Sequence, residues 1–254
     1  MTDILQMIVR SLRVMLRQPV ALIPNIAISV FFLFVYQAGL SPVADLPGFH
    51  GSYLGFILPV AIVSAAVGGA GSAGQALVRD IESGYFTKLL LTPASRLSLI
   101  WGPSVAGAVV LVFQVVLIVV LALFMGLKSA TGVAGLVVVT GFAFLWGMAF
   151  AGYAVYVSLR TKNAAASQAA TFAFFPLLFL STTFVPQEFI TSGWLKVVAK
   201  INPTTYVFAA MRSLLLDGWQ LRPLLIGAAV VVAFATLTGG LALRQARRST
   251  RLAG

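Results

Sequence analysis

Charged side chains are scarce in this chain. Only 9% of its 254 residues are Asp, Glu, Lys or Arg, whereas soluble domains carry about 25%. With 60% hydrophobic residues, the chain has too few charged groups to cover a water-facing surface. Cysteine is absent, which excludes a disulfide framework, a thiol nucleophile and a cysteine-ligated metal. These absences predict an integral membrane protein.

Signs of catalysis are missing as well. No phosphate-binding G-x-x-x-x-G-K-[ST] loop is present, because none of the five lysines follows a glycine. Paired acids, a histidine cluster or an activated serine near the apolar runs are also lacking, and the single histidine, His50, lies in a loop near Asp45. We therefore expect no enzymatic activity, metal or cofactor in this chain. If ATP powers the protein, another chain must bind ATP and Mg²⁺.

Long apolar runs dominate what is present. A membrane span needs about 20 mainly apolar residues, and six runs qualify: 20–40, 54–78, 99–126, 133–158, 164–184 and 223–243. Their continuity excludes the alternating pattern of an outer-membrane barrel. The predicted fold is an all-α integral membrane protein with six transmembrane helices in one domain, residues 1–254. The span cores contain no ionisable residue, which argues against an ion-coupled transporter or a proton pump.

Basic residues set the orientation. With the amino terminus inside, twelve of the 17 lysines and arginines fall in inner segments and five in outer ones. Both termini are therefore predicted to lie in the cytoplasm. The net charge of +11 does not predict a nucleic-acid partner, because the basic residues are spread between apolar runs rather than gathered on one surface.

The first residues predict an amphipathic helix over 3–18. Arg10, Arg13 and Arg17 recur at helical spacing on one face, and leucines fall on the other. This pattern favours a helix in the cytoplasmic membrane interface with its arginines toward lipid phosphates. A solvated cytoplasmic helix is the alternative.

Small residues at four-residue steps mark the second predicted span, at Ala61, Ala65, Gly69 and Ala73. Such spacing lets helix backbones approach closely in lipid. It predicts helix packing, either within the subunit or across a dimer.

Two segments carry a resemblance to a known family. The inner loop includes Glu82, Gly84 and the pair Thr92-Pro93, and the outer segment includes Phe184-Val185-Pro186 and the run Asn202-Pro203-Thr204-Thr205-Tyr206. In this order and topology the chain resembles the permease subunit of ABC-2-type exporters of the daunorubicin-resistance kind. The resemblance implies a half-transporter of the bacterial cytoplasmic membrane. Its partners would be two copies of an ABC ATPase subunit, a second permease copy, identical or related, and membrane lipids.

The resemblance also implies that the inner loop forms a coupling helix over about 81–91, docked on the ATPase. Its candidate contacts are Glu82, Tyr85, Phe86, Lys88 and Leu89. A helix that only rests on lipid headgroups is the alternative.

The outer segment 186–221 is rich in aromatic and aliphatic residues. One short amphipathic helix is expected around Phe189 to Ile201, and a second capped by Thr204 or Thr205 and ending at Gly218. Family members carry short re-entrant helices here. The expected outer gate consists of Phe189, Trp194, Tyr206 and Arg212. We place Arg212 near the membrane edge, paired with Asp217 or a lipid phosphate.

The candidate lining of the pathway is aromatic and weakly polar. It comprises Asn25, Tyr36, Trp146, Phe150, Tyr153, Tyr156, Phe172, Phe175, Phe179, Ser181, Thr182 and Thr183. Such a lining suits a drug or a lipid, although for any single aromatic residue helix packing is the favoured interpretation. Export of a lipid-linked polysaccharide and a non-transport membrane scaffold remain the alternative functions.

Overall fold

The protein is described from a computed structural model that covers residues 8–10, 12–13, 19–46, 49, 51–85, 96–184 and 186–251. Within these ranges all regular structure is helical. The long helices are α2 (Pro19–Leu40), α3 (Tyr53–Glu82), α5 (Arg96–Phe124), α6 (Gly132–Thr161) and α11 (Leu221–Arg251). The short ones are η1 (Ser41–Asp45), α7 (Ala164–Phe172), α8 (Phe175–Phe179), η2 (Gln187–Phe189), α9 (Gly193–Ile201), α10 (Pro203–Arg212) and the π-helix η3 (Ser213–Asp217).

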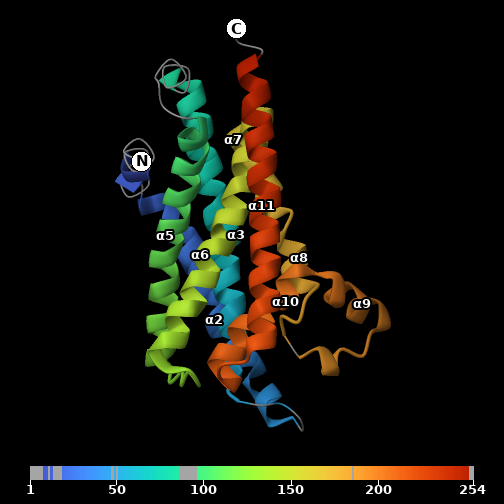
Figure 1. Ribbon diagram of the computed structural model, residues 1–254. Coiled ribbons are helices and arrows are strands. Elements are labelled where there is room, and N and C mark those ends of the chain that lie inside the picture. The colour runs from blue at the N-terminus through green and yellow to red at the C-terminus, as the bar shows by residue number, and fades with distance from the viewer. Residues whose placement is uncertain are drawn as a thin grey trace.

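The long helices run side by side along one axis and form an elongated bundle (Figure 1). Among the described residues, five helices are long and apolar enough to cross a membrane. These five correspond to the predicted spans 20–40, 54–78, 99–126, 133–158 and 223–243.

The predicted span 164–184 is not one continuous helix. It divides into α7 and α8, and residues 180–184 follow without regular helix. Pro176 stands at the start of α8. Proline has no backbone N–H and clashes with the preceding turn, so Pro176 weakens a continuous helix at this point. It does not account for the break by itself, because α2 and α3 continue through Pro24 and Pro59. In Figure 1 this broken segment still leads the chain from the α6–α7 connection toward α9 and α10.

Helix α3 is the centre of the bundle. All of its most apolar stretch is buried, and it contacts α2, α5, α6, α7 and α10. The small residues on α3 serve packing within the subunit, one of the two predicted uses. A Cβ atom added to Gly74 would lie 2.2 Å from Ser167 Oγ and 3.1 Å from the carbonyl oxygen of Ala154. Glycine is therefore required where α6 and α7 press on α3.

Two ends of the bundle are defined by contacts between distant segments. At one end, Leu77 of α3, Leu159 of α6 and Ala246 of α11 pack in one cluster, and these helices carry Arg79, Arg160 and Arg244 nearby. We call this the basic end. At the opposite end, which we call the loop end, the backbone N–H of Ala130 donates to the carbonyl oxygen of Leu215 at 3.0 Å.

The positions of the two described ends of the chain follow from this arrangement. The C-terminal end of α11 lies at the basic end (Figure 1). The described part of the predicted interfacial helix is helical at residues 8–10 and 12–13, and Arg10 contacts Asp80 near the end of α3. Arg17 lies outside the described residues. Both described ends of the chain are thus joined to the same end of the bundle, whereas its orientation in a membrane remains a prediction.

Candidate functional site: an aromatic face and the two ends of the bundle

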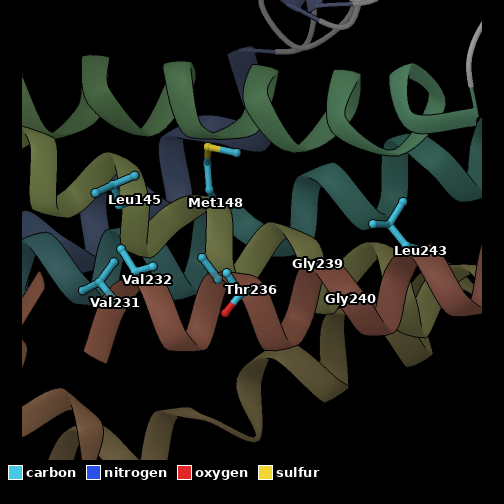
Figure 2. Close-up of a pocket in the computed structure, with 9 residues that line it drawn as sticks. Leu145, Met148, Val231, Val232, Thr236, Gly239, Gly240 and Leu243 are labelled. Atoms are coloured by element: carbon cyan, nitrogen blue, oxygen red, sulfur yellow. The ribbon is translucent and has the colours of Figure 1, made fainter. Parts of the chain in front are cut away.

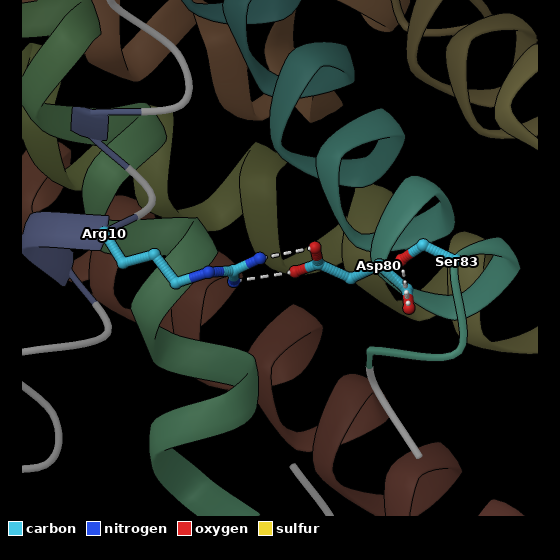
Figure 3. Close-up of polar contacts among 3 residues, drawn as sticks. All are labelled: Arg10, Asp80 and Ser83. Atoms are coloured by element: carbon cyan, nitrogen blue, oxygen red, sulfur yellow. Dashed lines mark hydrogen bonds and ion pairs between the residues drawn. The ribbon is translucent and has the colours of Figure 1, made fainter. Parts of the chain in front are cut away.

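Arg10 and Asp80 form an ion pair at the basic end. Two guanidinium nitrogens of Arg10 donate to the two carboxylate oxygens of Asp80 at 2.7 and 2.9 Å (Figure 3). The same guanidinium lies 4.0 Å from the ring centre of Tyr85. Ser83 Oγ donates to the Asp80 carbonyl oxygen at 3.2 Å in the last turn of α3. The amino-terminal helix is therefore held against the point where α3 leads into the predicted coupling loop.

Asp80 was missed by the sequence reasoning. It lies next to Arg79 in the last turns of α3, within the predicted inner loop, where Glu82 was the only acidic residue that we selected. The signal was present, because the chain has only six acidic residues against 17 basic ones. In a chain so poor in carboxylates, each acid at the inner end is a candidate partner for an arginine.

The predicted coupling residues are only partly described. Glu82 lies in the last turn of α3 with an exposed side chain, and Tyr85 is half-buried against Arg10. Phe86, Lys88 and Leu89 lie outside the described residues. The docking role of this loop therefore stays a prediction.

Several predicted pathway aromatics lie inside the subunit. Trp146 and Phe150 of α6 are 1% and 3% exposed. They pack on Phe234 of α11 and on Phe174, with ring centres 5.2 to 5.5 Å apart for the closest pairs. This cluster holds α6 against α11 and the broken segment. Trp146 and Phe150 could line a pathway only if these helices moved apart.

Two predicted tyrosines lie farther toward the basic end. Tyr153 stacks edge-on against Phe174, with ring centres 4.9 Å apart. The hydroxyl of Tyr156 accepts a hydrogen bond from Arg160 at 3.1 Å. Both tyrosines are half-buried. The side chain of Asn25 lies outside the described residues, so its lining role stays a prediction.

A second aromatic group lies at the surface between α2 and α8. Its members are Phe32, Tyr36, Phe175, Phe179 and Phe184, with neighbouring ring centres 5.1 to 6.4 Å apart, and we call it the aromatic face. Phe179 is 40% exposed and the other four are half-buried. Three of its members, Tyr36, Phe175 and Phe179, were predicted as lining. These rings come from segments well over a hundred residues apart in the sequence.

Arg212 is buried inside the subunit, and its partners there are neither Asp217 nor a lipid phosphate. The residue is 8% exposed. Its Nε donates to the carbonyl oxygen of Phe56 at 2.8 Å, and its terminal nitrogens donate to Thr182 Oγ1 at 3.1 Å and Thr183 O at 3.2 Å. The predicted partner Asp217 is exposed at the end of η3. Burial lowers the pKa of Arg212 to about 9, which leaves the guanidinium charged at pH 7.

Arg212 and Asn202 complete the backbone hydrogen bonding of the broken segment. Residues 180–184 have no helix partners for their carbonyl groups, and such groups are costly when buried. Asn202 Nδ2 donates to Leu177 O and Leu180 O at 2.5 and 3.2 Å. The Ser181 hydroxyl also donates to Leu178 O. The segment after α8 is therefore held by side chains of the outer segment rather than by helix geometry.

The other members of the expected outer gate lie on three different elements. Phe189 lies half-buried in η2, whereas Trp194 of α9 is 65% exposed. Tyr206 of α10 donates its hydroxyl to Lys200 O at 2.6 Å. Helix α9 stands to the side of the bundle (Figure 1). The joint role of these residues as an outer gate stays a prediction.

The second outer helix ends at Gly218 as predicted, at a φ of +100°, but its cap is not Thr204 or Thr205. The side chain of Asn202 caps α10 by accepting from Thr204 N at 3.0 Å. Pro203 occupies the first position of the helix, where its missing N–H has no cost. In the sequence, the pair Asn202-Pro203 was the signal that could have predicted this cap.

Gln114 is a further residue that the sequence reasoning missed. It lies in α5 with no exposed surface, and neither polar atom of its side-chain amide has a hydrogen-bond partner among the described residues. A buried amide without partners costs free energy on the order of 2 kcal/mol or more. In the sequence, the signal for this residue was a single glutamine within the apolar run 104–124. Buried polar groups without a hydrogen-bond partner are rare in native structures.

The chain belongs to the ABC-2 type transporter family, whose pattern matches residues 2–216. It is 29% identical over 232 residues to the daunorubicin resistance ABC transporter permease protein DrrB1 of Streptomyces coeruleorubidus, covering 87% of this chain and 78% of the relative. It is 28% identical over 201 residues to the ycf38 protein of Cyanophora paradoxa, named as a transport permease, covering 78% and 69%.

A third relative is DrrC of Mycobacterium tuberculosis, named as a doxorubicin resistance ABC transporter permease protein. The identity is 23% over 209 residues, covering 82% of this chain and 75% of the relative. The family predicted from the inner loop and the Asn-Pro segment is thereby confirmed.

Proposed function

We propose that this chain is the membrane-spanning permease subunit of an ATP-driven ABC exporter, with a hydrophobic or amphipathic drug or lipid as its cargo. The family and the names of two relatives support the permease role. The observation that carries the cargo class is the aromatic face between α2 and α8. It offers flat apolar surface, partly open, and none of its five members carries a charge.

A lipid-linked polysaccharide is less well supported as cargo. Sugar chains require many hydrogen-bonding groups beside stacking rings, and of the five residues of the aromatic face only Tyr36 carries a hydroxyl. A flat drug or an acyl chain loses little by leaving water and gains dispersion contact with such rings. The aromatic face therefore favours the apolar cargo.

Two copies of a separate ATPase chain and a second permease would complete the exporter, in the cytoplasmic membrane of a bacterium with both termini of the permease inside. The exposed Glu82 at the basic end supports this side as the docking side. The Arg10–Asp80 pair supports a rigid link between the amino-terminal helix and the coupling loop. ATP and Mg²⁺ would be bound by the ATPase.

Docking is tested by a double substitution, Glu82→Ala with Phe86→Ala, in the permease reconstituted with its ATPase. An aromatic anchor contributes on the order of 2 kcal/mol at an interface, or about thirty-fold in affinity. We expect weaker ATPase capture and lower cargo-dependent ATP turnover, with membrane insertion unchanged. Transport at the wild-type rate would refute the docking role of this loop.

The cargo site is tested by Tyr36→Ala and Phe179→Ala, measured as drug-stimulated ATP turnover in reconstituted vesicles. The matched control is Phe113→Ala, which removes an aromatic ring of α5 that is 59% exposed and lies outside the aromatic face. We expect the two face variants to raise the drug concentration for half-maximal stimulation about tenfold and the control to leave it unchanged. Equal effects of all three variants would contradict the assignment.

A further inference from the structure

An apolar groove of about 440 Å³ runs between α6 and α11 (Figure 2). Leu145 and Met148 line it from α6, and residues from Val231 to Leu243 line it from α11. Gly240 borders open space in this groove, because an added Cβ atom would meet no heavy atom within 4 Å. It lies outside the aromatic face and outside the predicted coupling loop.

The groove offers few hydrogen-bond partners to a water molecule. The polar side chain of its lining, Thr236, already donates its hydroxyl to Ala233 O at 2.9 Å. A stable water needs two to four polar partners. Both helices are candidate membrane spans, so the groove opens on the hydrocarbon rather than on water. An apolar occupant is therefore favoured.

The dimensions fit one extended hydrocarbon chain. From Val231 to Leu243 the helix rises about 18 Å, and one leaflet of hydrocarbon is about 15 Å thick. If a methylene takes about the volume of a water molecule, roughly 30 Å³, the groove holds about fifteen methylenes. A helix of 10 Å diameter and the same length needs on the order of 1,400 Å³. The groove is thus too small to enclose a helix from a second copy of the chain.

One end of the groove lies at the basic end of the bundle. Leu243 packs on the same cluster as Tyr156, whose hydroxyl accepts from Arg160. Arg160 and Arg244 are both exposed. Neither α6 nor α11 contains an acidic residue, so these two helices present positive charge without a carboxylate of their own. These two arginines are therefore the candidate partners of a phosphate at this end of the bundle.

We infer that the α6–α11 groove binds an anionic phospholipid from the leaflet at the basic end, with one acyl chain along Val231 to Leu243 and the phosphate at Arg160 and Arg244. A guanidinium binds phosphate oxygens through paired N–H donors. The lipid bridges α6 and α11, and its site is separate from that proposed for the cargo.

The test uses the full-length chain purified in mild detergent and titrated with phosphatidylglycerol or with phosphatidylcholine of the same acyl chains. Native mass spectrometry counts the bound lipids. Gly240→Leu places a side chain in the groove at a position where an added Cβ atom meets no heavy atom within 4 Å, and replacing a helical glycine by leucine also favours the helix. The matched control is Gly39→Leu in α2, where an added Cβ atom also meets nothing within 4 Å.

We expect one tightly bound phosphatidylglycerol in the wild type, about tenfold weaker binding in Gly240→Leu and unchanged binding in Gly39→Leu. Arg160→Ala combined with Arg244→Ala should abolish the preference for phosphatidylglycerol while phosphatidylcholine binding persists. Wild-type affinity in Gly240→Leu, or equal wild-type affinity for both lipids, would overturn the inference. So would a shift from dimer to monomer in Gly240→Leu with lipid binding unchanged, since that would make the groove a contact between copies.

Discussion

Replacing Arg212 tests whether its guanidinium holds the broken segment in place. Arg212→Lys keeps the buried charge but replaces a planar fork by a single ammonium, which cannot reach Phe56 O, Thr182 Oγ1 and Thr183 O together. Hydrogen bonds from a charged donor contribute about 1.5–3 kcal/mol each, and the guanidinium also lies 3.4 Å from the ring centre of Phe56. Losing two of the three bonds should destabilise the fold by about 4 kcal/mol.

Arg212→Met should cost less than Arg212→Lys. Methionine also loses the three hydrogen bonds, but it removes a buried charge, whose desolvation costs several kcal/mol. We expect a loss of about 1–2 kcal/mol for methionine. At about 2–4 °C per kcal/mol for a domain of this size, lysine should lower the Tm by about 8–16 °C and methionine by about 2–8 °C.

The assay is thermal unfolding of the purified chain in lipid nanodiscs. Arg222→Lys at the exposed start of α11 is the matched control, with a Tm within about 1 °C of the wild type. A reporter cysteine at Leu180, introduced into a chain that has no other cysteine, should react faster with thiol reagents in both Arg212 variants. A lysine variant as stable as the wild type, or more stable than the methionine variant, would refute the reasoning.

Three further predictions concern packing, the basic end and topology. Gly74→Ala should destabilise the bundle by about 3 kcal/mol through overpacking, while Gly69→Ala, whose Cβ would meet its nearest neighbour at 3.8 Å, should be neutral in the same unfolding assay. A double-mutant cycle of Arg10→Ala and Asp80→Ala should give a coupling of about 1 kcal/mol, and strictly additive effects would contradict the ion pair. Ser192→Cys should react with an impermeant thiol reagent in intact cells; complete protection would contradict the outward placement of the outer segment.

The sequence predicted five long helices, with starts within three residues and ends within eight residues of those observed. The prediction succeeds because a span must satisfy all its backbone hydrogen bonds internally and expose apolar side chains over about 20 residues. Those requirements are local and can be read from composition. The same apolar run over 164–184 was predicted as a sixth continuous helix, yet the structure divides it into α7 and α8, with Pro176 in the first turn of α8. The composition of a run does not show where a proline interrupts a helix and where, as in α2 and α3, it does not.

The family was also within reach of the sequence, because the inner loop and the Asn-Pro segment stand in a fixed order along the chain. Only the tertiary structure decided which residues meet. It placed Trp146 in the core and Phe179 at the surface, although both are apolar residues in apolar helices.

Arg212 shows the physical reason most clearly. From the sequence we expected Asp217 or a lipid phosphate to satisfy its charge, because an unpaired charge is costly in hydrocarbon. The fold instead brings Phe56, Thr182 and Thr183 around the guanidinium and satisfies it there. These partners are up to 156 residues away along the chain. Burial of a charge depends on partners that only the assembled bundle supplies, whereas helix length and apolarity depend on neighbours in sequence.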